Sequence, residues 1–358
     1  MSFELPLTVR ADIADLAPYR SPQQPARYRM NTNESPYPPP AGLLDEVFGE
    51  VRGAALNRYP DHRARALVEA VSHHVSWPVD GVAVANGSNE VLLHLFLAFG
   101  GPGRRALVFE PTYSLHSTIA RMTGTEVIAA RRRDDFRIDS EAGPHAVRAA
   151  APDIVVVCSP NNPTGGCEEL EVVEALLAAA PGLVLVDEAY VEFAGAARDL
   201  QRLLDAHRNL VIVKTLSKAW RLAGVRLGYM LAATEIVAEI ARVRLPYHLS
   251  TFSQAIGTAA LRRADDALKH VRAITAQRDR ITRGLDELGA ETFDSHANFV
   301  LFRVAGARRV WTALLADGVL VRDYSETDGL RDCLRVTAGT SEETDAFLSG
   351  MKGALPRG

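Results

Sequence analysis

Lys218 is the residue of this sequence with the clearest capacity for covalent chemistry. It follows the apolar run 210–213 and a turn that contains Thr215 and Ser217. A lysine withdrawn from water has a lowered pKa, and its neutral amine can attack a carbonyl group. A lysine after a strand is more often a solvated surface residue, so other residues must decide between the two interpretations.

Polar residues also follow other apolar runs of the chain. Gly87, Ser88 and Asn89 come after one such run and lead into a predicted helix. Ser88 is a favourable N-cap, and exposed amides at a helix start attract an anion such as phosphate. A simple capping turn would explain this segment equally well. Tyr113 follows another run, where it could stack on a planar ring or pack under a loop.

Other functional groups follow further predicted strands. They are the amide of Asn162, the carboxyl group of Asp187, the phenol of Tyr190 and the guanidinium of Arg226. Two prolines and a glycine fix the turn around Asn162. A carboxylate at the end of a buried strand, such as Asp187, needs a cation or a hydrogen-bond donor beside it. Together with Lys218, these residues supply what pyridoxal phosphate requires: a Schiff-base lysine, a phosphate site, a flat face and an acid beside the pyridine nitrogen.

The strands and helices expected around these residues predict an α/β fold. Their short runs are mostly continuously apolar, which is typical of parallel strands covered on both faces. Helical stretches lie between the runs, and open sheets of this kind place ligands at the carboxyl ends of their strands. We therefore expect a mainly parallel seven-stranded sheet. Its predicted strands are 82–85, 106–109, 127–129, 154–158, 183–186, 210–213 and 228–231.

The domain organisation follows from changes in this pattern. Residues 1–40 are rich in proline and are expected to form an extended arm, followed by a large cofactor-binding domain over 41–250. A smaller α+β domain is predicted over 251–358, entered through one long connecting helix at about 253–288. Its other predicted elements are strands at 298–303, 319–322 and 333–336 and helices near 310–315 and 342–351.

Composition narrows the functional class. The chain has 358 residues, which favours about two domains, and 47% of them are hydrophobic. A net charge of -4 gives no reason to expect nucleic acid or a membrane as a partner. Three cysteines without CxxC spacing indicate neither a disulfide framework nor a metal site, and they fit a reducing compartment. With no recognisable signal segment, we expect a cytoplasmic location.

The order of these motifs along the chain resembles the fold-type I, class II pyridoxal-phosphate-dependent aminotransferases, and the resemblance covers nearly the whole sequence. Finer matches resemble the histidinol-phosphate aminotransferases within that group. The motifs shared with the wider group are 87–89, Tyr113, 161–165, 187–190, 217–218 and Arg226. The finer matches are 15–19, 31–34, 57–60, 245–250, 297–302, 321–323 and 333–335.

This resemblance implies a role for each cofactor residue. Lys218 would form the Schiff base and then act as acid and base, while Asp187 would pair with the pyridine nitrogen. Asn162 and Tyr190 would bind the ring oxygen, and Tyr113 would stack on the ring. The residues implied for the phosphate end are Gly87, Ser88, Asn89, Thr215, Ser217 and Arg226, with Tyr59 reaching it from the partner subunit of a homodimer.

The resemblance also implies a substrate site. Arg335 would bind the α-carboxylate of glutamate or, in turn, the phosphate of histidinol phosphate. Tyr19, Asn33, Tyr247 and Arg322 would lie nearby. The implied reaction is ping-pong transfer of an amino group between histidinol phosphate and 2-oxoglutarate, which belongs to histidine biosynthesis.

Three positions depart from the family pattern and leave other substrates open. They are Ser35, and Trp220 and Arg221 just after the predicted catalytic lysine. An aromatic amino acid aminotransferase, a paralogue of secondary metabolism with another amino acceptor, and a phosphothreonine decarboxylase would share the same frame. A cofactor-binding regulator without turnover is a different class, but it would not need both Lys218 and Arg335.

Overall fold

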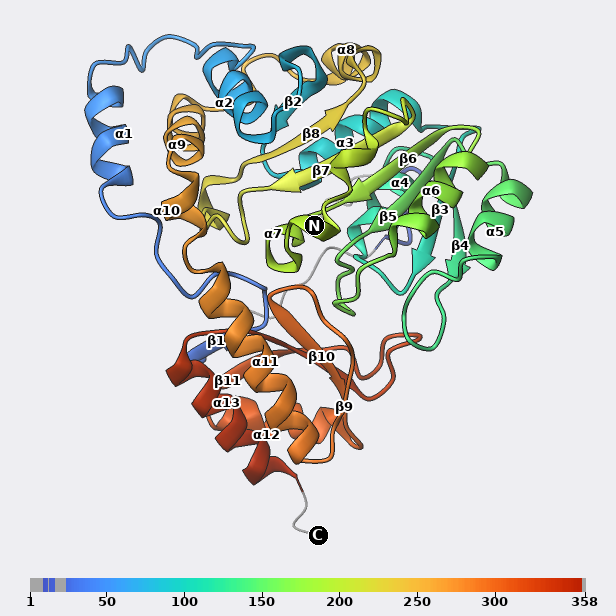
Figure 1. Ribbon diagram of the computed structural model, residues 1–358, viewed down its shortest axis with the longest axis vertical. Coiled ribbons are helices and arrows are strands. Elements are labelled where there is room, and N and C mark those ends of the chain that lie inside the picture. Colours follow the sequence, from blue (N-terminus) through green and yellow to red (C-terminus); the bar gives the residue numbers. More distant parts are fainter. Residues whose placement is uncertain (1–8, 12, 17–23, 356–358) are drawn as a thin grey trace, which may run out of the picture.

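Seven strands form the large sheet at the centre of the computed structural model, which describes residues 9–11, 13–16 and 24–355 (Figure 1). The strand order is β2-β8-β7-β6-β5-β3-β4, and β8 runs against the other six. This confirms the expected mainly parallel sheet. The strands are β2 (Val82–Ala85), β3 (Arg105–Glu110), β4 (Glu126–Arg131), β5 (Ile154–Cys158), β6 (Leu183–Asp187), β7 (Leu210–Thr215) and β8 (Gly228–Ala232).

The continuous apolar runs are explained by helices on both faces of this sheet. In β5, Val155 and Val157 belong to one hydrophobic cluster and Ile154 and Val156 to another, because successive side chains point to opposite faces. Helices α2, α5 and α6 contribute to the first cluster, and α3, α4 and α8 to the second. Their bounds are α2 (Arg65–Val75), α3 (Ser88–Phe99), α4 (Leu115–Met122), α5 (Ala142–Ala150), α6 (Leu170–Ala179) and α8 (Thr234–Val243).

Shorter elements connect these layers. They are the helices α1 (Leu43–Arg52) and α7 (Val191–Ala194) and the 3-10 helices η1 (Val79–Gly81), η2 (Ala196–Arg198), η3 (Leu200–Leu203) and η4 (Ala223–Val225).

A second sheet has five strands in the order β1-β11-β12-β10-β9. Strand β1 comes from the segment that the sequence predicts only as an extended arm, and it pairs in parallel with β11. The residues that follow β1 thereby reach the carboxyl ends of the large sheet's central strands, where Thr32 contacts Lys218 and Asn33 contacts Tyr190. The strands are β1 (Tyr28–Met30), β9 (Glu291–Thr292), β10 (Phe299–Arg303), β11 (Val319–Asp323) and β12 (Cys333–Thr337).

The helical stretch expected at 253–288 is not one helix but three, α9 (Thr251–Arg262), α10 (Ala264–Leu268) and α11 (Val271–Glu287). Arg263, between the first two, has φ -114 and ψ 37, outside the helical range. The carbonyl oxygens of Asp266 and Ala267 accept hydrogen bonds from the guanidinium of Arg221. In a continuous helix, these two carbonyl groups would accept hydrogen bonds from backbone N–H groups of the next turn. Here they accept hydrogen bonds from the Arg221 side chain instead.

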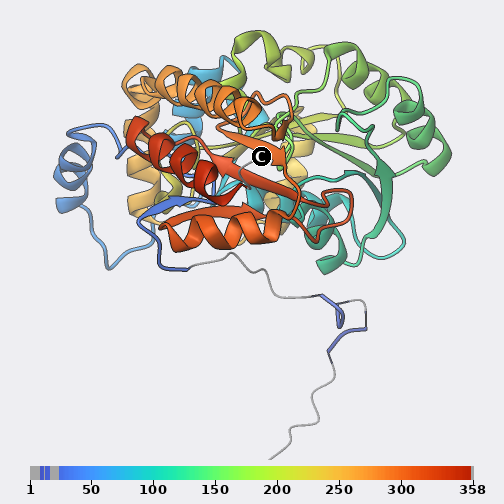
Figure 2. The same ribbon diagram turned by 90° about the horizontal axis from the view of Figure 1, so that it is seen from below.

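Helices α11, α12 (Ala307–Ala316) and α13 (Ser341–Ala354) gather against the small sheet (Figure 2). Within the described residues, no helix combines the length and apolar character needed to cross a membrane. The division into domains at residues 40 and 250 stays a prediction.

Candidate active site

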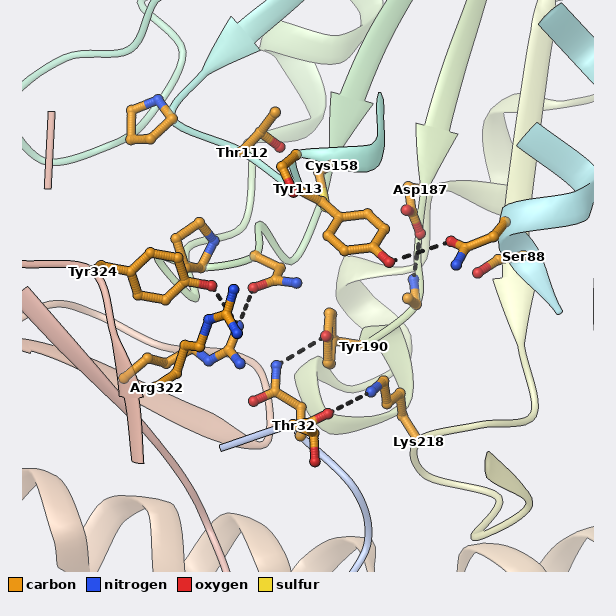
Figure 3. Close-up of a pocket in the computed structure, with 18 of the residues that line it drawn as sticks. Thr32, Ser88, Thr112, Tyr113, Cys158, Asp187, Tyr190, Lys218, Arg322 and Tyr324 are labelled. Atoms are coloured by element: carbon orange, nitrogen blue, oxygen red, sulfur yellow. Dashed lines mark hydrogen bonds between the residues drawn. The ribbon is translucent and has the colours of Figure 1, made fainter. Parts of the chain in front are cut away.

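A cavity of about 490 Å³ lies where the carboxyl ends of β5, β6 and β7 meet the small sheet (Figure 3). It collects most of the residues that the sequence singles out, from segments far apart in the chain. Those that line it are Asn33, Ser88, Asn89, Tyr113, Asn162, Asp187, Tyr190, Thr215, Ser217, Lys218, Arg226, Arg322 and Arg335.

Lys218 points into this cavity. Its Nζ donates a hydrogen bond to the carbonyl oxygen of Thr32, 3.0 Å away, and lies 5.8 Å from the ring centre of Tyr190. Burial lowers the pKa of Lys218 to about 8, and the positive charges of Arg335 and Arg226 act in the same direction. The neutral form of this amine, which attacks a carbonyl, is therefore far more abundant near physiological pH than in a solvated lysine.

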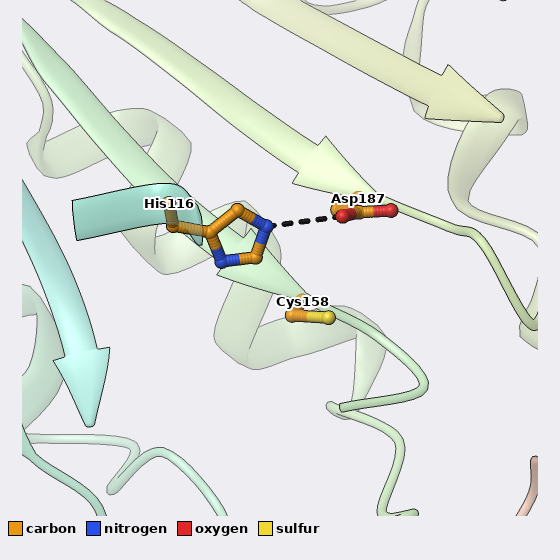
Figure 4. A group of neighbouring side chains, drawn as sticks. All are labelled: His116, Cys158 and Asp187. Carbon is orange, nitrogen blue, oxygen red and sulfur yellow. Dashed lines mark hydrogen bonds and ion pairs between the residues drawn. The ribbon is translucent and has the colours of Figure 1, made fainter. Parts of the chain in front are cut away.

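Asp187 lies at the end of β6 and is held by a histidine that the sequence does not reveal (Figure 4). Its Oδ2 lies 3.0 Å from Nε2 of His116, which is fully buried on α4. Its Oδ1 accepts a hydrogen bond from the amide of Ala189. His116 fixes the direction of the carboxylate. The only signal for it in the sequence is its position three residues after Tyr113, whose ring it meets edge-on at 5.4 Å.

Cys158 is the cross-strand neighbour of Asp187, and its sulfur lies within 4.8 Å of the potential ligand atoms of His116 and Asp187. Burial raises the pKa of this thiol, with the charge of Asp187 adding to the effect. Since a metal is bound by the thiolate, this grouping is better suited to hold Asp187 than to hold a metal ion.

Hydroxyl groups and a guanidinium meet at the start of α3. Thr215 Oγ1 donates to Ser217 Oγ at 2.9 Å, and Arg226 Nη1 donates to the same oxygen at 3.3 Å. Gly87 has φ 84, and a Cβ there would lie 2.6 Å from Arg226 Nη2, so the backbone approaches the guanidinium more closely than another residue would allow. Gly87 is the N-cap and Ser88 the first helical residue, so the predicted N-cap role of Ser88 is wrong.

Tyr113 and Tyr190 are two of the aromatic residues that line the cavity. The hydroxyl of Tyr113 lies 3.4 Å from Asn89 Oδ1. Tyr190 is buried, and its hydroxyl accepts a hydrogen bond from Asn33 Nδ2 at 3.0 Å. Asn33 has φ 56 and is fixed through Thr337, which bonds to both its amide nitrogen and its Oδ1. The segment after β1 therefore closes one wall of the cavity.

Arg335 occupies the side of the cavity formed by the small sheet. It is buried and donates to Asn162 Oδ1, to the Tyr324 hydroxyl at 3.1 Å and to the carbonyl of Asn31 at 2.8 Å. Its Nε is buried without a hydrogen-bond partner among the described residues. Arg322 is its directly opposite partner on β11, and the Tyr324 ring lies 5.6 Å from both guanidinium groups.

Of the described residues that the sequence predicts for the site, Gly87 adjoins Ser88 without lining the cavity itself, and two others lie apart from the cavity. Tyr59 and Tyr247 stack on each other at a centroid distance of 4.4 Å. Tyr59 is 80% exposed and Tyr247 43%, and neither lines the cavity. Tyr19 lies outside the described residues.

The three departures from the family pattern also lie away from the cavity. Arg221 turns back to bond to the carbonyl groups of Pro38, Asp266 and Ala267. The indole of Trp220 is buried and donates to Glu192 Oε1 at 3.0 Å. Ser35 accepts a hydrogen bond from the amide of Tyr37. None of the three lines the cavity, so they do not bear directly on what it binds.

Sequence reasoning missed about half of the cavity wall. Most of the missed residues lie in loops beside the predicted motifs. Four others lie in segment 324–330, within the connection between β11 and β12. The missed lining residues are Asn31, Thr32, Glu110, Pro111, Thr112, Ser114, Ser117, Cys158, Pro163, Ala189, Tyr324, Thr327, Asp328 and Leu330.

Comparison with known proteins agrees with this geometry. Residues 29–350 match the model of the family described as aminotransferase class I and II. The chain belongs to this family. It is 47% identical over 361 residues to the histidinol-phosphate aminotransferase of Frankia casuarinae, covering 96% of this chain and 89% of that protein. It is 45% identical to the histidinol-phosphate aminotransferase of Thermobifida fusca, covering 98% and 96%.

Solved structures of this family share the fold. The histidinol-phosphate aminotransferase from Sinorhizobium meliloti, solved in complex with pyridoxal 5′-phosphate, superposes with a TM-score of 0.87 at 24% identity. The match covers 99% of this chain and 98% of that one. An aspartate aminotransferase variant from Thermus thermophilus gives 0.84 at 22%, covering 98% and 100%. The predicted fold-type I architecture is confirmed. The protein is an aminotransferase that acts on small-molecule substrates, and pyridoxal phosphate is its cofactor.

The cavity residues fit this cofactor. The start of α3, two hydroxyl groups and Arg226 make a place for a phosphate group, and the close approach at Gly87 leaves backbone amides next to it. Asp187 is a buried acid that suits a protonated ring nitrogen. At the other end, the buried Nε of Arg335 has a donor to offer an incoming anion.

Proposed function

We propose that this enzyme transfers an amino group between L-glutamate and imidazole-acetol phosphate, producing L-histidinol phosphate and 2-oxoglutarate, as a step of histidine biosynthesis. The relatives cited above carry that name at 45–47% identity over nearly the whole chain. The observation that supports the substrate in this chain is the pair formed by Arg322 and Arg335.

The two arginines are direct neighbours on antiparallel strands, where like charges destabilise the pairing. Arg335 is buried and has an unused donor at Nε. An anion bound between the guanidinium groups offsets the repulsion, and a phosphate with three oxygen acceptors can serve both. A doubly charged phosphate group therefore suits this end of the cavity better than an aromatic side chain does.

The same arginine serves both substrates in turn. Glutamate places its α-carboxylate on Arg335, and histidinol phosphate, which lacks an α-carboxylate, places its phosphate there with Arg322. Asn162 and Tyr324 hold the Arg335 guanidinium in place for both anions.

At the other end, the residues proposed for the cofactor act on its ring. When bound, pyridoxal phosphate withdraws electrons from the bonds at the substrate Cα. Asp187, held by His116, keeps a proton on the ring nitrogen, and Asn162 and Tyr190 bind the ring oxygen. Lys218 Nζ holds the cofactor and then moves a proton to and from the substrate Cα. The phosphate end is assigned to Gly87, Ser88, Asn89, Thr215, Ser217 and Arg226, with stacking by Tyr113.

A homodimer is part of this proposal. Tyr59 and Tyr247 form an exposed aromatic stack, and exposed apolar residues occur close to each of them in sequence: Leu56, Leu245 and Phe252. In the dimer, Tyr59 of one subunit would reach the phosphate end of the other. The three buried, unpaired cysteines fit a reducing compartment, and we propose the cytoplasm.

A half-reaction screen tests the substrate assignment. Purified enzyme with cofactor is mixed with histidinol phosphate, phenylalanine or tyrosine, and the loss of the cofactor absorbance band is followed in the stopped flow. We expect histidinol phosphate to react fastest by a wide margin. Faster conversion by phenylalanine would make the enzyme an aromatic amino acid aminotransferase. A separate incubation with phosphothreonine tests the remaining alternative, since release of carbon dioxide from its carboxylate would make the enzyme a decarboxylase.

A further inference from the structure

A second buried polar cluster lies behind the cavity. It consists of Lys214, Glu188, Asp199, Glu192 and Trp220, and we refer to it as the Lys214 cluster. Lys214 precedes Thr215 on β7, and successive residues of a strand point to opposite faces. Thr215 lines the active-site cavity, whereas Lys214 lines a separate cavity of about 480 Å³ together with Glu192 and Asp199.

Lys214 joins three segments of the backbone. It is 5% exposed, and its Nζ donates to Asp199 Oδ2 at 2.7 Å and lies 3.3 Å from Glu188 Oε2. The other oxygen of Glu188 accepts the amide of Leu200 at 2.7 Å, and Asp199 Oδ1 accepts the amide of Gln201. One ammonium group thus connects the end of β6, strand β7 and the start of η3.

Glu192 and Trp220 extend the cluster to the loop that carries Lys218. Glu192 Oε1 accepts the indole N–H of Trp220 at 3.0 Å. The indole is 1% exposed and meets the ring of His74 edge-on at 5.0 Å. Helix α7 is therefore tied to the turn two residues beyond Lys218.

Four of the five residues of the cluster lie one or two positions from a residue proposed for the active site. Glu188 follows Asp187, Lys214 precedes Thr215, Glu192 comes two residues after Tyr190, and Trp220 comes two residues after Lys218. A shift of the cluster would move the backbone from which those side chains reach the cavity.

Burying charged groups costs free energy, so the buried charges of the Lys214 cluster need a physical explanation. Burial raises the pKa of Glu188 to about 8, although the charge of Lys214 opposes it. Apolar residues of similar volume often replace a buried ion pair without loss of stability. Hydrogen-bonded charged groups can fix the orientation of the neighbouring backbone, whereas apolar packing does not.

We propose that Lys214 is a positioning residue for the cofactor: by holding Glu188 and Asp199 together, it fixes the directions in which Asp187 and Lys218 enter the cavity. The inference rests on the proposed roles of Asp187 and Lys218, and it does not depend on which substrate is used.

The test compares Lys214→Met, Lys214→Arg and Asp199→Asn with the wild type. Lys269→Met is the matched control, because it removes a half-exposed lysine that pairs with Asp266 and lines neither of the two cavities. Each protein is saturated with pyridoxal phosphate. The measurements are the visible circular dichroism per bound cofactor, the cofactor dissociation constant, kcat, KM and the melting temperature.

We expect Lys214→Met to alter the visible circular dichroism at saturation and to lower kcat by about tenfold to a hundredfold, with KM changed less than about threefold. Lys214→Arg should restore both, Asp199→Asn should show a smaller change, and Lys269→Met none. The inference is overturned if Lys214→Met keeps the wild-type dichroism and kcat and only its melting temperature falls. Should Lys214→Met not fold, a wild-type result for Asp199→Asn overturns it. Failure of the wild type to bind pyridoxal phosphate would instead refute the proposed function.

Discussion

The two ends of the cavity are built by different sheets and carry different electrostatics. The cofactor end belongs to the large, mainly parallel sheet, where Asp187 is the last residue of β6 and Lys218 follows β7, and burial lowers the pKa of the lysine. The substrate end belongs to the small mixed sheet, where Arg322 and Arg335 face each other directly on antiparallel strands. The first end can form and break bonds, and the second can select an anion. Changes at the first should therefore affect all substrates alike, and changes at the second should act according to the anion that each substrate presents.

The largest effect is expected from Lys218→Ala at the cofactor end. Loss of the amine removes both the attachment of the cofactor and the acid–base group, so kcat should fall by about 10⁴-fold with every substrate. The borohydride-sensitive absorbance band should disappear as well. Lys269→Ala serves as the control. Substantial turnover by Lys218→Ala would show that another residue performs the proton transfer.

Arg335→Lys should have the next largest effect. Lysine keeps the charge but cannot bond at once to Asn162, Tyr324 and an incoming anion. We expect kcat/KM to fall by roughly 100-fold, about 3 kcal/mol, for glutamate and histidinol phosphate alike. Steady-state kinetics with each substrate measures this. A loss confined to one substrate would mean that the two do not share this arginine.

The lowered pKa of Lys218 predicts how the apoenzyme takes up its cofactor. Only the neutral amine reacts, so the rate constant should level off above pH 8 and fall about tenfold for each pH unit below it. Arg335→Gln removes a nearby positive charge and should move the midpoint upward, whereas Arg335→Lys should leave it in place. Stopped-flow absorbance at several pH values measures the midpoint, and one near 10 would show that the lysine is solvated.

Arg322→Gln should separate the substrates. It removes a contact that we assign to the phosphate alone, so kcat/KM should fall about tenfold for histidinol phosphate and change little for glutamate. An equal loss with both substrates would place Arg322 in a structural role.

Tyr324→Phe is expected to give the smallest effect. It keeps the ring between the two arginines and deletes one hydrogen bond to Arg335, which is worth about 1 kcal/mol, or roughly fivefold in kcat/KM. Tyr324→Leu also removes the ring and should cost more. If the two variants behave alike, the ring itself does not contribute.

The cofactor end could be predicted from the sequence because its residues follow strands that are plainly visible. Apolar runs locate Asp187 and Lys218 at the same edge of the sheet, and parallel pairing brings them together. The substrate end was reached only through resemblance, because Arg335 on a short strand looks like any exposed cation. Tyr324 lies in the connection between two strands, where no periodicity indicates which way a side chain points.

The residues that support the site were harder to anticipate. His116 holds Asp187 from a helix, and only its position three residues after Tyr113 distinguishes it in the sequence from other helical histidines. Lys214 did leave a signal, since a charged residue inside a buried strand must have partners. Arg221 was expected to bear on the substrate, but its backbone has φ 63 and its guanidinium turns toward α10.

The most direct test of the assignment compares histidinol phosphate with histidinol, which has the same amine and imidazole but no phosphate. Single-turnover rates with cofactor-loaded enzyme are measured at subsaturating concentrations of each. If the arginine pair selects the phosphate, histidinol phosphate should react at least about 100-fold faster, and this ratio should fall about tenfold in Arg322→Gln and further in Arg335→Lys. Equal rates for the two compounds in the wild type would contradict the account.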